Sequence, residues 1–327
     1  MMSSRAKDGL IIFTGNANPA LARAVADCLH IPLGRAEIFS FSNENIFVKL
    51  NENVRSNDVF LIQPMSSPVN RSIMELLIMI DAAKRASAAR ITAVIPYYAY
   101  GRSDKKDQPR VPITARLIAD MITVAGANRL LTIDLHAGQI QGFFNIPVDE
   151  LTAVYILARY IREKQLERPV VVATDIGIAK RARNFAELVG APLAIVEKRR
   201  VGNNDRTEVL NVIGTVAGHQ AVLLDDEVDT GGSISLAART VLAHGATEVY
   251  AAFVHPVLSG PAIERLQEAH LTEVVTTDTV PIPPEKRIPL ITVLSVAPLL
   301  GEAILRVHTG ESVGMIFENE RQALRQG

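Results

Sequence analysis

Short apolar runs alternate with amphipathic stretches along almost the whole chain, which predicts strands and helices in turn. In the first half, apolar runs predict strands over 10–13, 59–63, 91–95 and 130–134. Helical spacing of apolar positions predicts helices between them, over 19–29, 73–86 and 113–125. Asn18 and Pro19 suit the cap and first turn of the first helix.

The same alternation begins again in the second half. Strands are predicted over 170–173, 193–196, 222–224, 248–253 and 273–276, with helices over 152–164, 179–189, 234–243 and 262–269. Strands separated by helices form parallel sheets covered on both faces. We therefore predict an α/β fold with two domains, 1–150 and 151–327, each a mainly parallel sheet flanked by helices. The C-terminal helix is a candidate for packing on the first domain.

The composition narrows the class of protein. With 48% hydrophobic and 21% charged residues over 327 positions, the chain can bury two cores. A formal net charge of −1 predicts binding to neither nucleic acid nor a membrane. The single cysteine, Cys28, excludes an internal disulfide, and its predicted helix face makes it a core residue. Since we find neither a membrane-length apolar run nor a signal peptide, we expect a cytoplasmic protein.

The stretch from Ala221 to Leu242 carries the strongest chemical signal. An apolar run predicts a buried strand that stops at two adjacent carboxylates, Asp225 and Asp226. A glycine loop and a helical repeat follow; the loop is Asp229, Thr230, Gly231, Gly232 and Ser233. Paired carboxylates can accept hydrogen bonds from adjacent sugar hydroxyls, and glycines let backbone N–H groups close on a phosphate at a helix N-terminus. We therefore predict a ribose 5-phosphate site.

Two other interpretations of this stretch are weaker. An ordinary strand-to-helix turn would contain the same residue types, but adjacent unpaired carboxylates repel one another and desolvate poorly. A Walker phosphate loop is excluded, since no Gly-Lys-Ser/Thr follows. The segment resembles the phosphoribosyl diphosphate (PRPP) loop of the phosphoribosyltransferase fold, although Glu227 stands where an apolar residue is usual.

A second polar cluster follows the strand predicted over 130–134. In open α/β sheets, ligands bind outside the carboxyl ends of the strands, and His136 emerges there. A lone histidine is more often a structural residue. The surrounding sequence, DLHAGQIQGFF over 134–144, is more specific and resembles ribose-phosphate diphosphokinases, also called PRPP synthetases.

The resemblance extends over nearly the whole chain. It includes GNANPALA (15–22), NENVR (51–55), the run 85–102, VPIT (111–114), Asp175 with Gly177, KRR (198–200) and HPVLSG (255–260). It implies two phosphoribosyltransferase-like domains, an active site at their interface, and homo-oligomers, either hexamers or dimers. It also implies the reaction of MgATP with ribose 5-phosphate to give PRPP and AMP, with Mg²⁺ as cofactor.

The resemblance also implies roles for single residues. His136 is expected to contact the nucleotide phosphates or the metal, and Asp175 to bind Mg²⁺ through a hard oxygen. Lys198 and Arg200 are expected in a loop after the strand 193–196, where they neutralise charge on the transferred group. A Lys-Arg-Arg run alone would more often be a solvated surface. No general base is evident from the sequence.

Nucleotide contacts are implied in two segments, and both depart from the family pattern. Where the family has Phe-x-Asp-Gly-Glu on a projecting hairpin, this chain has Phe41, Ser42, Asn43, Glu44 and Asn45. Arg-Gln-Asp becomes Arg102, Ser103 and Asp104. Further departures are Arg71, Ile178, Gln108 and Pro109, the last two in the family's effector segment, so we expect weak inhibition by ADP.

Three hypotheses remain for the function. The first is a PRPP synthetase that uses ATP or another nucleoside triphosphate, since an amide can donate where a carboxylate only accepts. The second is a weakly active or non-catalytic paralogue that acts as a regulatory subunit, which the intact Lys198, Arg200, His136 and Asp175 argue against. The third is a phosphoribosyltransferase, which usually needs one such domain and a base-binding hood.

Overall fold

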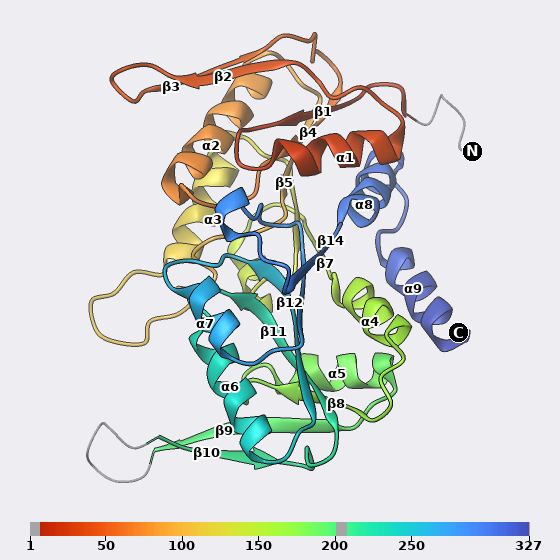
Figure 1. Cartoon of the computed structure of the whole chain (residues 1–327). Helices are drawn as coiled ribbons and strands as arrows, with labels where there is room; N and C mark the ends of the chain where they lie inside the picture. The colour runs from red at the N-terminus through yellow and green to blue at the C-terminus, as the bar shows by residue number, and fades with distance from the viewer. Residues whose placement is uncertain (1–6, 201–207, 327) are drawn as a thin grey trace. The chain divides into compact units, whose positions relative to one another are not determined.

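A computed structural model describes residues 7–200 and 208–326. The chain divides into two compact units (Figure 1). Unit 1 comprises Met1–Thr152, Thr279–Pro281 and Ser295–Phe317. Unit 2 comprises Ala153–Asp278, Ile282–Leu294 and Glu318–Gly327. Each unit has its own sheet and its own buried cluster of apolar side chains.

Unit 1 is built on a five-stranded parallel sheet in the order β1-β4-β5-β6-β7. The strands are β1 (Leu10–Thr14), β4 (Asp58–Ile62), β5 (Arg90–Ile95), β6 (Arg129–Ile133) and β7 (Val148–Leu151). Helix α1 (Pro19–Leu29) packs with α8 (Ala297–Thr309), and α2 (Val69–Arg85) packs with α3 (Thr114–Ala125), the two pairs on opposite faces (Figure 1). A hairpin of β2 (Ala36–Ser40) and β3 (Ile46–Leu50) lies beside α2.

Unit 2 has a seven-stranded sheet in the order β10-β9-β8-β11-β12-β13-β14, in which only the β9–β10 pair is antiparallel. Its strands are β8 (Pro169–Ala173), β9 (Leu193–Arg200), β10 (Glu208–Ile213), β11 (Gln220–Val228), β12 (Glu248–Pro256), β13 (Glu273–Thr277) and β14 (Ile291–Leu294). Helices α4 (Val154–Glu163) and α5 (Ala179–Val189) pack together, as do α6 (Gly232–Ala243) and α7 (Ala262–Glu268). The last helix is α9 (Gly314–Gln326).

The predicted fold class, an α/β protein with mainly parallel sheets flanked by helices, is confirmed. Local signals explain the most accurate boundaries. Asn18 accepts the Leu21 N–H at 3.2 Å and opens α1 at Pro19, as its cap sequence predicts. Gly190, with φ of 76°, closes α5 in the left-handed conformation that glycine favours.

Two strands are longer than predicted, which moves chemically important residues. Strand β9 continues to Arg200, so Lys198 and Arg200 lie in a strand and not in a loop, opposite Leu210 and Glu208 of β10. Strand β11 continues through Asp225 and Asp226 to Val228. Polar residues extend both strands because a neighbouring strand supplies hydrogen-bond partners, which apolar patterning does not reveal.

Cys28 is exposed, which contradicts its prediction as a core residue. The buried stripe of α1 runs along Leu21, Val25 and Leu29, and Cys28 lies at the edge of that stripe. No helix in the described ranges, 7–200 and 208–326, is long and apolar enough to cross a membrane.

Candidate active site

The two carboxylates of β11 are held at the carboxyl end of the unit 2 sheet. The Thr174 hydroxyl donates to Asp225 Oδ2 at 2.8 Å, and the Asp226 N–H donates to Asp225 Oδ1 at 2.9 Å. Asp226 is buried, and Arg181 Nη1 lies 3.7 Å from its Oδ2. Burial and the neighbouring Asp226 raise the pKa of Asp225 well above its usual value. Two carboxylates this close together repel one another. A ligand with several hydroxyl donors would stabilise them by hydrogen bonding.

The loop from Asp229 to Ser233 is braced by α7 and by the segment that joins β12 to α7. The Ser259 hydroxyl donates to the Asp229 carboxylate, and the Ser259 N–H donates to the Asp229 carbonyl oxygen at 2.8 Å. Arg265 Nη1 donates to the Thr230 carbonyl oxygen at 3.1 Å. These contacts hold the loop in shape, and Thr230 and Ser233, whose hydroxyls are candidate donors, are exposed.

Glycine is required at Gly231 for two reasons. Its φ of 75° is left-handed, and a Cβ there would lie 3.2 Å from the Ala262 carbonyl oxygen. The intrahelical bonds of α6 begin when the Ser235 N–H donates to the Gly231 carbonyl at 3.0 Å. The N–H groups of Gly232, Ser233 and Ile234 therefore have no intrahelical acceptor, and the helix dipole favours an anion in front of them.

Asp175 lies between β8 and α5 and is exposed. Its Oδ1 accepts the Ile178 N–H at 3.1 Å, which places the carboxylate at the start of α5. A Cβ at Gly177 would lie 3.0 Å from the same oxygen, so the glycine leaves room for the carboxylate. Ile178, one of the departures from the family pattern, is buried and packs in the core.

Lys198 and Arg200 are two residues apart in β9, and their backbones pair with Leu210 and Glu208 of β10. Their side chains, and the residues 201–207 that join the strands, lie outside the described part of the chain.

His136 of unit 1 stands on a short segment anchored at both sides. Leu135 and Ile140 are buried in the core, whereas His136 itself is exposed. A Cβ at Gly101 would lie 3.2 Å from the His136 Cβ, so the chain at Gly101 packs directly against the histidine. Gln139 Nε2 donates to the buried Asp104 carboxylate. The structure therefore brings His136 together with the predicted nucleotide segment Arg102, Ser103 and Asp104.

The other predicted nucleotide residues form the tip of the β2–β3 hairpin. The Phe41 N–H donates to the Asn45 carbonyl oxygen at 2.9 Å, and Asn43 Oδ1 accepts the Asn45 N–H at 3.2 Å. Phe41 packs its half-exposed ring on Phe39 and Phe47. An aspartate oxygen could accept the same N–H, so the turn is the same with either residue. The change from aspartate to Asn43 therefore alters only the group that the turn presents to solvent.

Arg71, which departs from the family pattern, has a partner in this chain. Its Nε donates to Glu75 Oε1 at 3.2 Å. Glu75 is almost fully buried and also accepts from Gln63 Nε2 at 3.0 Å and Asn16 Nδ2 at 3.0 Å. The Arg71 guanidinium thus pairs with the buried Glu75 carboxylate, whose other side-chain donors are the amides of Gln63 and Asn16.

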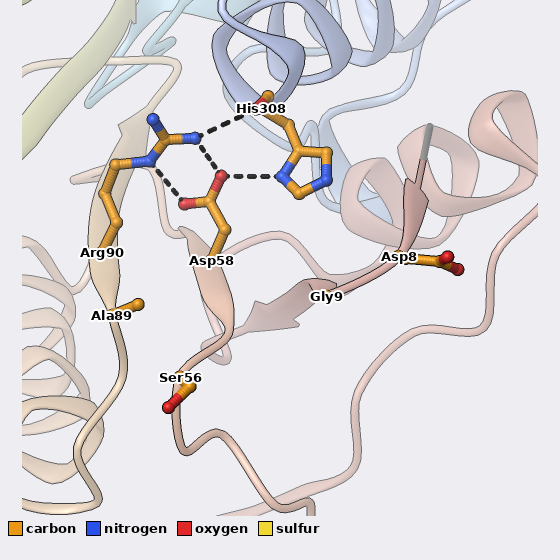
Figure 2. A pocket seen from close by; sticks show the side chains of 7 residues that line it. All are labelled: Asp8, Gly9, Ser56, Asp58, Ala89, Arg90 and His308. Atoms are coloured by element: carbon orange, nitrogen blue, oxygen red, sulfur yellow. Dashed lines mark hydrogen bonds and ion pairs between the residues drawn. The ribbon is translucent and has the colours of Figure 1, made fainter. Parts of the chain in front are cut away.

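A pocket of about 310 Å³ lies at the opposite, amino-terminal edge of the unit 1 sheet (Figure 2). Asp58 at its wall accepts from Arg90 Nε at 2.8 Å and from His308 Nδ1 at 2.8 Å. The hydrogen bond to Asp58 raises the pKa of Arg90. Since Asp58 and Arg90 begin β4 and β5, this pocket lies at the opposite end of the unit 1 strands from His136, which follows β6.

The bracing residues Thr174, Arg181 and Arg265 were not predicted, because each acts from a segment distant in sequence. Ser259 lies in the motif HPVLSG, so its position was indicated although its contact was not.

Comparisons with known proteins agree with the geometry. Residues 10–126 match the N-terminal domain of ribose phosphate pyrophosphokinase, and residues 201–318 match the phosphoribosyl synthetase-associated domain. The ribose-phosphate pyrophosphokinase of Caldanaerobacter subterraneus subsp. tengcongensis is 55% identical over 315 residues, 96% of this chain and 99% of that protein. The one from Clostridium acetobutylicum is 54% identical over 311 residues, 94% of this chain and 97% of the relative.

A solved structure is similar over the same length. The phosphoribosylpyrophosphate synthetase from Mycobacterium smegmatis is 44% identical, with a TM-score of 0.88 over 92% of this chain and 99% of that one. The matches extend over both units, including the segments that carry His136, Asp175 and the Asp225–Ser233 stretch. The chain therefore belongs to the ribose-phosphate pyrophosphokinase family.

Proposed function

We propose that this protein transfers the diphosphoryl group of MgATP to the C1 hydroxyl of ribose 5-phosphate, giving PRPP and AMP. The hydroxyl oxygen attacks the β-phosphorus, the bond from that phosphorus to the α,β-bridging oxygen breaks, and AMP leaves as the hydroxyl proton is released. The observation that carries the proposal is the carboxylate pair of β11 leading into the glycine start of α6.

Both the phosphate and the ring hydroxyls of ribose 5-phosphate find partners in this stretch. Its phosphate would accept from the N–H groups of Gly232 and Ser233 and from the hydroxyls of Thr230 and Ser233. Its ring hydroxyls would donate to Asp225 and Asp226. Because burial and mutual repulsion raise the pKa of Asp225, hydroxyl donors at that position relieve an unfavourable charge.

The nucleotide residues proposed in unit 1 are His136, Arg102 and Asp104, with Ser103 between the latter two. The packing of Gly101 on His136 and the bond from Gln139 to Asp104 make one local surface of them. Exposed imidazole and guanidinium groups on that surface suit the triphosphate.

The residues also fit Mg²⁺. This ion is usually held by one or two carboxylates together with substrate phosphates, so it does not need a dedicated cluster of protein ligands. Asp175 offers an exposed carboxylate, and His136 would contact a metal-bound water or a phosphate, since Mg²⁺ prefers oxygen ligands. When bound, the ion would neutralise charge on the β- and γ-phosphates.

Lys198 and Arg200 are proposed to neutralise charge on the diphosphoryl group during transfer. Their places two residues apart in the same strand, β9, support a joint action. We also propose a homo-oligomeric, cytoplasmic enzyme.

The base of the donor is proposed to be less strictly adenine. Asn45 is exposed at the hairpin tip, and Ser103 has a shorter side chain than the usual glutamine. The Asn45 amide can donate as well as accept, and Ser103 reaches less far, so the hydrogen bonds that would distinguish ATP from other nucleoside triphosphates are weakened.

The direct test incubates purified protein with ribose 5-phosphate and Mg²⁺ plus ATP, GTP, CTP or UTP in turn, and measures PRPP and the nucleoside monophosphate together. Equal amounts of the two products are expected. Absence of PRPP with all four donors would overturn the proposal and favour the regulatory paralogue.

A further inference from the structure

Glu150 holds both ends of the segment that carries His136. Its Oε1 accepts the Leu135 N–H at 3.0 Å, one residue before the histidine. Its Oε2 accepts from Gln141 Nε2, five residues after the histidine. One carboxylate on β7 thus bridges the start of the segment and the 3-10 helix Gly138–Phe143 that ends it.

The backbone of this segment needs such support because it leaves β6 abruptly. Asp134 has a φ of 40°, which is unfavourable for a residue with a side chain. The Thr152 hydroxyl donates to Asp134 Oδ1 at 2.8 Å, and the Asp134 N–H donates to the Leu151 carbonyl oxygen at 2.9 Å. Residues 150–152 therefore act as one support for the exit from β6.

The support comes from the edge of the sheet. Among the described residues, β7 pairs with β6 alone, and Glu150 lies opposite Thr132 in that register. Thr132 is fully buried and donates to the Ile95 carbonyl oxygen at 2.7 Å, so the strand under Glu150 is firmly placed. The Glu150 carboxylate therefore fixes the backbone on both sides of His136 relative to the sheet.

We propose that Glu150 is a positioning residue for His136. This inference rests on the proposed function, in which His136 contacts the nucleotide phosphates or a metal-bound water. The carboxylate clamp keeps the imidazole in the orientation needed for transfer, whereas ribose 5-phosphate is proposed to bind through Asp225 and the loop from Asp229 to Ser233. Loss of the clamp should therefore lower kcat and leave the KM for ribose 5-phosphate unchanged.

The expected size follows from the geometry of transfer. A displacement of about 1 Å of a positioned group lowers turnover by about 100-fold. Glu150→Ala removes the acceptor from the Leu135 N–H and releases Gln141, so we expect kcat to fall by about 10- to 100-fold. Glu150→Gln should stay within about threefold of wild type, because its oxygen can accept from Leu135 while the Gln141 amide turns to accept from its nitrogen.

A second variant pair keeps the side-chain volumes and exchanges the charges. Gln141→Glu places two carboxylates face to face and should lower kcat as Glu150→Ala does. Adding Glu150→Gln restores one amide and one carboxylate, so the double variant should recover most of the lost turnover. Asp81→Ala, which removes an exposed carboxylate paired with Arg85 on α2, is the matched control.

Two measurements separate this inference from the proposed function. Deuterium uptake of a peptide that begins well before Leu135, such as 130–141, includes the Leu135 N–H and should rise in Glu150→Ala and Gln141→Glu, whether or not the protein makes PRPP. Steady-state kinetics of PRPP formation reports the consequence. The inference is overturned if uptake is unchanged in both variants, if Glu150→Ala keeps kcat within twofold of wild type, or if the double variant is no better than Gln141→Glu.

Discussion

Replacement of Asp225 by asparagine should stabilise the folded protein while weakening its binding of ribose 5-phosphate. The carboxylate is desolvated and lies beside Asp226, and both causes raise its pKa above the ordinary value. A group whose pKa rises on folding holds its proton more tightly in the folded state, so its ionisation at neutral pH opposes folding. Asparagine removes that ionisation without changing the size of the side chain.

The local hydrogen bonds survive the change. The amide oxygen of the new side chain can accept the Asp226 N–H in place of Asp225 Oδ1, and its amide nitrogen can donate to the Thr174 hydroxyl oxygen. The Thr174 proton then turns to the Leu224 carbonyl oxygen, which already lies 3.4 Å away. Both hydrogen bonds of the carboxylate are thus replaced, so the net effect is relief of the buried charge, about 1–3 kcal/mol.

The assay is thermal unfolding at pH 8 and at pH 4, with Asp120→Asn on the exposed face of α3 as control. Each kcal/mol corresponds to about 2–4 °C in a domain of this size. The unfavourable term grows as pH rises above the unfolded-state pKa of about 3.9, so the gain in Tm should be present at pH 8 and nearly absent at pH 4.

Although Asp225→Asn should stabilise the fold, steady-state kinetics should show weaker binding of the sugar phosphate. Loss of a charged acceptor for a sugar hydroxyl should raise the KM for ribose 5-phosphate by about 10- to 100-fold, with the KM for the nucleotide unchanged. A fall in Tm at pH 8, a gain that does not depend on pH, or an unchanged KM for the sugar would refute the reasoning.

Three further predictions follow from other parts of the molecule. Lys198→Ala and Arg200→Ala should each lower kcat by about 100-fold or more with little change in ribose 5-phosphate affinity measured by calorimetry; turnover near wild type in both would remove them from the mechanism. Reverting the donor-contact departures together should shift the ratio of kcat/KM toward ATP over GTP, CTP and UTP, and an unmodified enzyme already strict for ATP would contradict this; the changes are Asn43→Asp, Glu44→Gly, Asn45→Glu and Ser103→Gln. Burial raises the pKa of Glu273, but hydrogen bonds from Lys164, Thr292 and Tyr160 outweigh it and lower the pKa overall. Its contribution to stability is therefore present above the unfolded pKa and lost as pH falls through the folded pKa, so Glu273→Ala should lower Tm by about 2–4 °C at pH 7 and by much less near pH 3, whereas an equal loss at both pH values would exclude the ionic contribution.

Much of the architecture follows from local sequence. The boundaries of α1 and α5 were predictable because Asn18 and Gly190 satisfy helix ends within a few residues of themselves. The strand, acid pair and glycine loop leading to Ser233 were predictable for the same reason, since a phosphate-binding helix start is built from consecutive residues. The family membership was evident from ordered motifs along the whole chain.

Tertiary structure decided what depends on residues distant in sequence. Strand β7 is short and polar because it is an edge strand, and only pairing with β6 makes it a strand at all. The extension of β9 to Arg200 required β10 as a partner, and the exposure of Cys28 depends on which face of α1 is covered. The raised pKa of Asp225 comes from burial, and the clamp by Glu150 comes from an edge strand folded beside His136. Propensity and spacing encode local hydrogen bonds, whereas burial, strand partners and carboxylate environments arise only when separate segments pack together.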